Sequence, residues 1–223
     1  MTTPDPTLAA TALIDSDHPA VRAFAQAHAR GAGVRERACS LYLAVRDDFR
    51  YDPYQADLSP EGMRASTVLA QGHGWCVTKA ALLAAACRAS AIPARVGYAD
   101  VRNHLSTERM RREMKTDIFA WHGYTEILIE GRWSKATPAF NIELCERFGL
   151  LPLQWDGLED SLYHPFDRAG RRHMEYLRQR GSFDDVPLAQ MVADFKALYP
   201  GWQIAGGGDA KGDFSADVAK EQP

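Results

Sequence analysis

Apolar side chains recur every three or four residues in the first part of the chain, over residues 18–30 and again over residues 34–49. In the second stretch Leu41, Val45 and Phe49 fall on one side of a helix, because a helical turn takes 3.6 residues. The pattern predicts two amphipathic helices that turn these apolar sides toward a common core.

A third stretch, residues 75–89, is apolar on all sides and consists mainly of Ala, Leu and Val. Alanine and leucine are strong helix formers, and a helix without a polar side is buried. The stretch follows a glycine-containing loop at residues 71–74 and stops before Pro93. We therefore expect a buried central helix that begins directly after a tight loop.

Three shorter stretches carry the β-branched and aromatic residues that favour strands. They are residues 94–101, 122–129 and 132–136, and the turn Glu130-Gly131 joins the last two into a hairpin.

Helical spacing is found in four further stretches, at residues 105–115, 141–148, 167–180 and 187–198. Helices, then strands, then helices indicate an α+β fold with an antiparallel sheet and extra helices on the C-terminal side.

The length of 223 residues suits one domain with additional residues at its ends. Residues 1–17 are expected to be flexible. Residues 18–200 are expected to form a single domain, with a core at about 34–141 and a helical extension at 142–200. Residues 201–223, rich in Gly, Asp, Lys and Ala, are expected to be disordered.

Charge and cysteine usage argue against several classes of function. The formal net charge of −3 gives no attraction to nucleic acid or to an acidic membrane. No stretch approaches the roughly 18 consecutive apolar residues of a membrane span, and no signal peptide is visible at the start. The four cysteines lack C-x-x-C spacing and the histidines lack H-x-x-x-H spacing, so neither a metal nor a cofactor is expected. These features predict a cytoplasmic protein with free thiols.

Cys76 stands where the glycine-containing loop meets the central helix. The free N–H groups and the positive dipole end of a helix favour a thiolate, and they also stabilise an oxyanion. This placement makes Cys76 the candidate nucleophile, although most free cysteines are plain core residues. Core packing is the preferred interpretation for Cys87, and neither Cys39 nor Cys145 has an activating context.

A nucleophilic cysteine needs a base, and His122 is the preferred candidate. It opens a predicted strand beside an exposed connection, where a side chain faces a cleft while the strand fixes its position. His73 is the rival, three residues before Cys76, but a loop neighbour so close seldom offers an aligned ring nitrogen. The other histidines, His173 among them, are expected on the surface.

The order of the motifs resembles the transglutaminase-like superfamily over residues 34–141. The motifs are Gly74-Trp75-Cys76, Ile92-Pro93-Ala94-Arg95-Val96-Gly97-Tyr98, His122-Gly123-Tyr124-Thr125-Glu126 and Gly131-Arg132-Trp133. The resemblance implies a papain-like core in which the cysteine begins a central helix packed on an antiparallel sheet that carries the histidine. It also implies acyl transfer from a peptide or protein substrate through a thioester. Gly74 and Trp75 are candidate substrate-binding residues, with core packing the alternative for the tryptophan.

One position departs from the family pattern. The third catalytic residue of the family is usually an Asp just after the Trp-containing strand, and here Thr137 occupies that place. A threonine hydroxyl accepts a hydrogen bond from an imidazole but supplies no negative charge. Asn141 is an equal candidate for the orienting role, and so is an acid from the C-terminal half such as Asp156 or Asp160.

Two hypotheses follow for the function. The first is a cysteine acyltransferase or amidohydrolase in which Cys76 attacks an amide and His122 moves the proton. The second, prompted by Thr137, is a catalytically weak or inactive module of the same fold that binds a peptide or protein partner.

Overall fold

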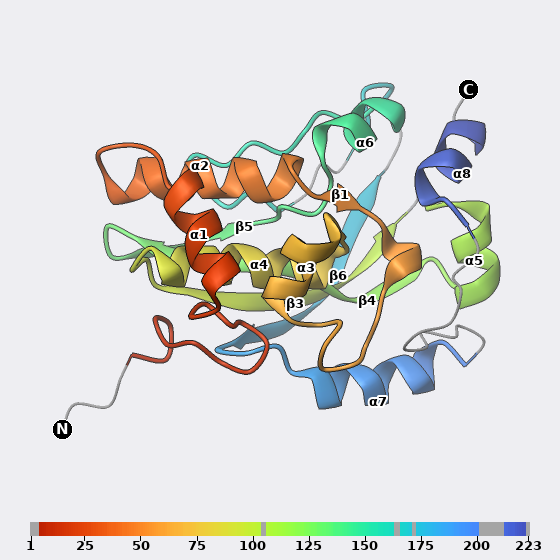
Figure 1. The fold of residues 1–223 in the computed structure, drawn as a ribbon. Helices are drawn as coiled ribbons and strands as arrows, with labels where there is room; N and C mark the ends of the chain where they lie inside the picture. The colour runs from red at the N-terminus through yellow and green to blue at the C-terminus, as the bar shows by residue number, and fades with distance from the viewer. Residues whose placement is uncertain (1–4, 104–105, 163–165, 171–172, 201–211, 222–223) are drawn as a thin grey trace.

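A four-stranded antiparallel sheet with helices packed on it forms the centre of the computed structural model, which describes residues 5–103, 106–162, 166–170, 173–200 and 212–221 (Figure 1). The strand order is β5-β4-β3-β6. The strands are β3 (Ala94–Asn103), β4 (Ile118–Ile129), β5 (Arg132–Ala136) and β6 (Met174–Phe183). The predicted α+β class with an antiparallel sheet is confirmed.

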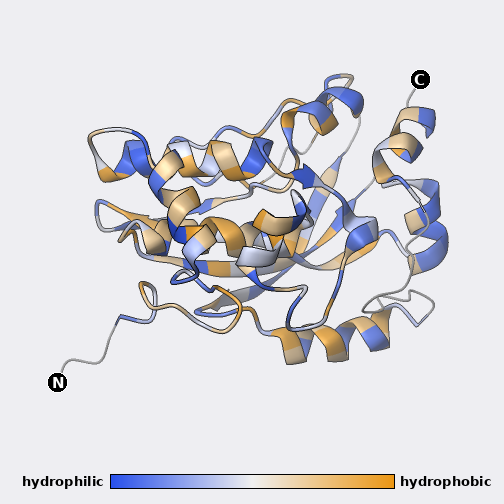
Figure 2. Ribbon diagram, viewed as in Figure 1, coloured by the Kyte–Doolittle hydropathy of each residue, from blue (hydrophilic) through white to orange (hydrophobic). Residues whose placement is uncertain are grey.

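Helix α4 links the sheet to the other helices of the N-terminal half. It contacts β3 and β4 on one side, while α1, α2 and α3 pack around its remaining sides. The helices are α1 (Pro19–His28), α2 (Val34–Asp47), α3 (Ala65–Gln71) and α4 (Cys76–Ala89). The residues of α4 from Cys76 to Arg88 are all buried, so the prediction of a buried central helix is confirmed. In Figure 2 this helix has mostly the colours of hydrophobic residues.

The remaining elements are short. Two parallel two-residue strands precede α4, namely β1 (Arg50–Tyr51) and β2 (His73–Gly74), with the 3-10 helix η1 (Pro53–Gln55) between them. The later helices are α5 (Glu108–Met114), α6 (Ile142–Arg147), α7 (Leu188–Leu198) and α8 (Phe214–Glu221). In Figure 1, α5, α6 and α8 stand at the right and α7 runs along the bottom.

Two predictions of secondary structure are wrong for the C-terminal half. The helix predicted over residues 167–180 is not formed from Met174 on, because β6 begins there and pairs with β3; residues 171–172 lie outside the described residues. The residues of β6 are half-buried or exposed except Met174, as expected for an edge strand. Hydrogen bonding to β3 therefore decides the structure of this segment, although its charged residues have helical spacing. The C-terminal segment is not disordered throughout, since Phe214 and Val218 of α8 are buried, whereas residues 201–211 and 222–223 lie outside the described residues.

The N-terminal segment also differs from the prediction of flexibility. Ile14 is fully buried, and the backbone oxygen of Thr7 accepts a hydrogen bond from Ala94 N–H at the start of β3. Residues 5–17 therefore pack on the domain, while residues 1–4 lie outside the described residues.

Strand β4 passes very close to the first turn of α4 at Gly123. A Cβ atom on Gly123 would lie 2.9 Å from Cys76 O and 3.0 Å from Val77 Cα, both backbone atoms. Backbone atoms do not move aside cheaply, so glycine is required for this packing.

We expect Gly123→Ala to lower the free energy of unfolding by about 1–3 kcal/mol, because the added methyl group forces the helix and the strand apart. Chemical denaturation measures the change. Gly33→Ser is the control, since no atom lies within 4 Å of a Cβ at Gly33 and serine suits its helix N-cap position. Equal stability of Gly123→Ala and wild type would contradict the close approach.

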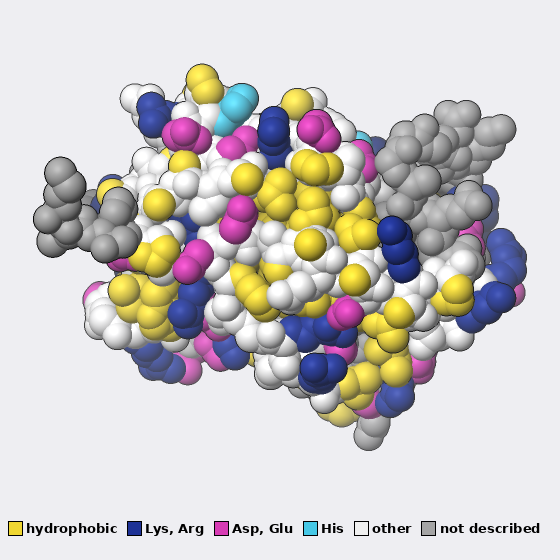
Figure 3. Space-filling view, turned by 90° about the horizontal axis from the view of Figure 1, so that it is seen from below, with side chains coloured by type: hydrophobic (Ala, Val, Ile, Leu, Met, Phe, Trp, Pro, Cys, Tyr) yellow, Lys and Arg dark blue, Asp and Glu magenta, His cyan; other side chains and the backbone are white. Residues whose placement is uncertain are grey.

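The surface seen from below carries both hydrophobic and polar side chains. Hydrophobic side chains there form groups separated by charged and other polar atoms (Figure 3). Leu198, at the end of α7, is 48% exposed. In the part of the chain that the structure describes, no helix has both the length and the apolar composition to cross a bilayer.

Candidate active site

Helix α4 starts directly at Cys76. Trp75 is its N-cap, in an extended conformation, and donates its backbone N–H to Thr78 Oγ1 at 3.1 Å. A Cβ atom on Gly74 would meet the same oxygen at 2.8 Å, so the position favours glycine. Because β2 pairs with β1, the chain enters α4 along a fixed path that leaves Cys76 at the helix N-terminus.

Burial controls the protonation of Cys76. The side chain is 6% exposed, and burial raises the pKa of its thiol to about 11. The backbone N–H groups of Gly123 and Val77 oppose this shift but do not overcome it. Burial thus outweighs the helix N-terminus, which favours a thiolate, and at neutral pH the thiol of Cys76 carries its proton.

The protonated thiol predicts a steep pH dependence of alkylation. Because only the thiolate reacts, the rate at Cys76 with iodoacetamide is expected to rise about tenfold per pH unit from about pH 6 to pH 9. Mass spectrometry of the peptide that contains Cys76 measures the rate, with the denatured chain as the control for an ordinary thiol. A rate that stays flat across this range would indicate a thiolate–imidazolium pair instead.

His122 lies within β4 rather than at its start, because the strand begins at Ile118. It pairs with Ala99 of β3 and lines the same pocket as Cys76. The residue is 5% exposed, and burial, followed by the charge of His173, lowers the pKa of its imidazole to about 4. His122 is therefore neutral at neutral pH, which is the form that accepts a proton.

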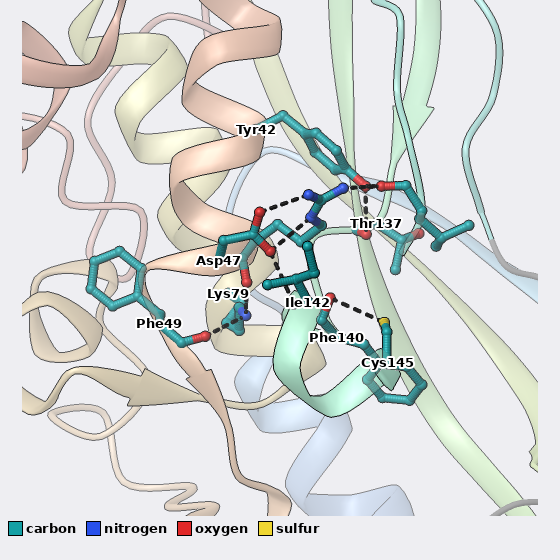
Figure 4. Close-up of polar contacts among 10 residues, drawn as sticks. Tyr42, Asp47, Phe49, Lys79, Thr137, Phe140, Ile142 and Cys145 are labelled. Carbon is teal, nitrogen blue, oxygen red and sulfur yellow. Dashed lines mark hydrogen bonds and ion pairs between the residues drawn. The ribbon is translucent and has the colours of Figure 1, made fainter. Parts of the chain in front are cut away.

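Thr137 and His122 line a second pocket, which shares His122, Phe140 and Met174 with the first. His122 Nε2 and Thr137 Oγ1 are both buried, and neither has a hydrogen-bond partner among the described residues. The backbone holds Thr137 in place: its N–H donates to Ser161 O at 3.0 Å, and its carbonyl oxygen accepts from Tyr42 Oη at 3.3 Å (Figure 4). Thr137 thus borders the base but supplies no charge to it.

The other candidates for the third residue lie elsewhere. Asn141 Oδ1 accepts the backbone N–H of Tyr51, which ties α6 to β1. Asp156 pairs with Arg35 and accepts backbone N–H groups in its own loop. Asp160 accepts the N–H of Lys135. None of the three lines either pocket that His122 lines.

His173 is a site residue that the sequence analysis missed. It is 3% exposed, stacks on Phe140 with ring centroids 5.8 Å apart, and lines the second pocket with His122. Its sequence neighbours are charged and helix-like, so nothing in the local pattern indicated burial.

Lys79 lies one turn beyond Cys76 in α4, but its side chain links α4 to the end of α2. It is fully buried, and its Nζ donates to the carbonyl oxygens of Arg46 at 2.9 Å and Phe49 at 2.6 Å, at the end of α2 (Figure 4). Burial lowers the pKa of Lys79 to about 7. The amine thus satisfies carbonyl oxygens that the end of α2 leaves without helical partners.

The pocket at Cys76 is mainly apolar and encloses about 490 Å³, its open mouth included. Trp75 lines it and packs on Phe195 of α7 at a centroid distance of 6.2 Å, whereas Gly74 is not among its lining residues. No Lys, Arg, Asp or Glu is among the described residues that line it. Nor do three His, Cys, Asp or Glu side chains within the described ranges gather closely enough to hold a metal ion.

Comparison with known proteins assigns the fold. A model of the transglutaminase-like superfamily matches residues 22–138, more than half of the chain. The crystal structure of a candidate cysteine protease from Cytophaga hutchinsonii aligns with a TM-score of 0.50 at 18% sequence identity, which shows likeness of fold. The alignment covers 82% of this chain and 48% of that one, so this chain spans about half of the other's length. A search of curated proteins found no match.

The matched segment contains both Cys76 at the start of α4 and His122 in β4. The fold, the motif order and the family model agree, and the chain belongs to the transglutaminase-like superfamily.

Proposed function

We propose that this chain is a thiol enzyme that transfers the acyl group of a peptide or amide substrate through a thioester at Cys76. One observation supports the proposal above all: Cys76, at the N-terminus of α4, and His122, in β4, line the same pocket. A buried thiol beside a neutral imidazole is the pairing that nucleophilic catalysis requires.

The chemistry begins from two neutral groups. As the sulfur of Cys76 attacks the amide carbon, the imidazole of His122 accepts the thiol proton. Backbone N–H groups at the start of α4 stabilise the oxyanion of the tetrahedral intermediate. The C–N bond then breaks, the leaving amine takes the proton from His122, and a thioester remains. Water or a second amine attacks this thioester, with His122 again removing the proton, and the free thiol returns.

The pocket lining points to an uncharged group next to the reacting amide. Its wall consists mostly of apolar and aromatic side chains, among them Met110, Met114, Phe119 and Phe195. A charged substrate group placed there would lose its hydration without gaining a partner. Methionine side chains are flexible, so this wall adapts to apolar groups of different shape.

A peptide panel tests the proposed function. The residue that carries or adjoins the scissile amide is varied among apolar, neutral polar and charged types, and hydroxylamine is added to trap the thioester. We expect hydroxamate formation with neutral peptides and an acyl adduct on Cys76 in the intact mass. A folded protein that forms neither product nor adduct with any peptide would overturn the proposal.

A specific observation favours a second candidate, a weak or inactive module that binds a peptide partner. Thr137 stands in the place of a carboxylate, and His122 Nε2 has no hydrogen-bond partner among the described residues. This candidate requires that Cys76→Ala retain the full biological effect of the chain. Loss of the effect in a correctly folded Cys76→Ala protein would exclude it.

A further inference from the structure

Bulges interrupt the strand pairing on both sides of β3 beside His122. Between Ala99 and Val101, the partner positions on β4 advance by three residues, so β4 carries one extra residue at this point. On the other side of β3, the register of β6 shifts twice, between Tyr98 and Ala99 and between Asp100 and Val101. These shifts leave Arg180 and Leu177 as extra residues. Bulges bend a strand and redirect the side chains that follow, and the bulge in β4 directly precedes His122.

The bulge in β4 depends on an unfavourable backbone conformation at Trp121. This residue has φ = 62°, in the left-handed region that a bulky side chain seldom adopts. Such a conformation persists only where surrounding contacts enforce it. If the backbone relaxed here, the register would shift, and a shift of one residue turns the next side chain to the other face of the sheet.

Four side chains from four elements hold this conformation. Asp100 Oδ1, on β3, accepts the backbone N–H of Trp121 at 3.1 Å, and Asp194 Oδ2, on α7, accepts its indole N–H at 2.9 Å. Arg180, on β6, donates to both carboxylates, and its guanidinium lies over the indole ring at 4.4 Å. We call Asp100, Trp121, Arg180 and Asp194 the Trp121 clamp.

Burial distinguishes the Arg180–Asp100 pair of the clamp from an ordinary surface ion pair, whereas Asp194 is 40% exposed. The side chains of Arg180 and Asp100 are 10% and 13% exposed, so solvent screens their pairing little. Tyr199, just after α7, adds a further contact, because its hydroxyl accepts the N–H of Ala120 at 2.6 Å in the same bulge. The contacts therefore converge on the two residues before His122.

We propose that the Trp121 clamp positions the base: it holds the bulge of β4 so that His122 faces Cys76 instead of the opposite side of the sheet. Arg180 and Asp194 lie beyond residue 138, where the family match ends, so the C-terminal extension supplies two of the four members. The extension thereby serves the catalytic core rather than only covering it. This inference rests on the proposed function for its effect on turnover, but not for its effect on the position of His122.

The chain contains a matched control at the other end of the same two strands. Arg95 of β3 pairs with the buried Glu126 of β4 at 2.6 Å, and its guanidinium lies 4.4 Å from the centroid of Trp133. Like the clamp, this group combines an arginine, a carboxylate and a tryptophan, though with one carboxylate fewer. It lies at none of the bulges and lines neither pocket that His122 lines. Arg95→Met therefore removes an ion pair and a cation–π contact without touching the clamp.

The experiment compares Arg180→Met and Asp194→Asn with Arg95→Met in the full chain. We expect the clamp variants to lower kcat about 10- to 100-fold with little change in KM, because a base displaced by about 1 Å transfers protons poorly. We expect Arg95→Met to change kcat less than about threefold, and Arg180→Lys to recover part of the loss because it keeps the charge. Equal losses in Arg180→Met and Arg95→Met, or no loss in either, would overturn the proposal.

An NMR readout separates this inference from the proposed function. The imidazole signals of His122, assigned by their disappearance in His122→Gln, are expected to shift in Arg180→Met and to stay in place in Arg95→Met. This holds whether or not the wild-type protein turns over any substrate, so absent turnover contradicts only the proposed function. Unchanged His122 signals in a folded Arg180→Met protein would contradict the clamp alone.

Discussion

Replacing Cys76 with alanine is expected to lower kcat/KM for amide turnover by at least about 10⁴-fold while the fold is retained. The thioester cannot form without the sulfur, and what remains is the small acceleration that backbone N–H groups and binding supply. The buried thiol occupies a site where alanine fits, so circular dichroism and thermal melting are expected to change little. Hydroxamate formation in the presence of excess neutral peptide measures the loss.

Variants of His122 show whether the loss in Cys76→Ala comes from a step that the two side chains share. His122→Ala is expected to cost nearly as much as Cys76→Ala, and the double variant hardly more than either, because the two groups act as one unit. Cys39→Ala is the control, since Cys39 lines neither pocket at the dyad. Additive losses in the double variant would show that the two side chains do not share one step.

Replacing Thr137 with aspartate is expected to raise kcat about 10²- to 10³-fold. Thr137 lines a pocket together with His122, and His122 Nε2 is buried without a hydrogen-bond partner among the described residues. A carboxylate there would accept a hydrogen bond from Nε2–H and stabilise the imidazolium that forms when the thiol is deprotonated; loss of such a group costs about 10⁴-fold in a triad. The rate of turnover at saturating peptide measures the gain.

The pH profile gives this prediction a second readout. Burial lowers the pKa of His122 to about 4, and a nearby negative charge raises it. The acid limb of the profile is therefore expected to move toward neutral pH in Thr137→Asp. Thr137→Asn matches the size without the charge and is expected to leave the limb in place. If folded Thr137→Asp shows neither the gain nor the shift, the third position of this site is not residue 137.

The local sequence was sufficient to predict an element when the pattern within that element alone determines its structure. The apolar run at residues 75–89 predicted α4, because a helix without a polar side has only the interior to occupy. The glycine-containing loop before it placed Cys76 at the helix N-terminus. Motif order then placed His122 on a neighbouring strand, and the structure confirms that this strand contacts α4.

Features that depend on contacts between residues far apart in the chain could not be predicted from the sequence. The charged residues of β6 have helical spacing, and only pairing with β3 makes them a strand. Burial of His173 depends on Phe140, far away in the sequence. The protonated thiol of Cys76 likewise reflects how completely the sheet and helices enclose it, which the helix dipole argument alone does not include. No local pattern marks Trp121 for a left-handed conformation, since that conformation is enforced by three other elements.

The enclosed, protonated state of Cys76 has a consequence for the lifetime of the protein in air. Peroxides oxidise thiolates that solvent reaches, and the damage beyond sulfenic acid is irreversible. A thiol with a pKa of about 11 and 6% exposure offers neither the charge nor the access. The proposed nucleophile thus stays reduced between encounters with substrate, and its survival as a free thiol during storage is expected to depend little on added reductant.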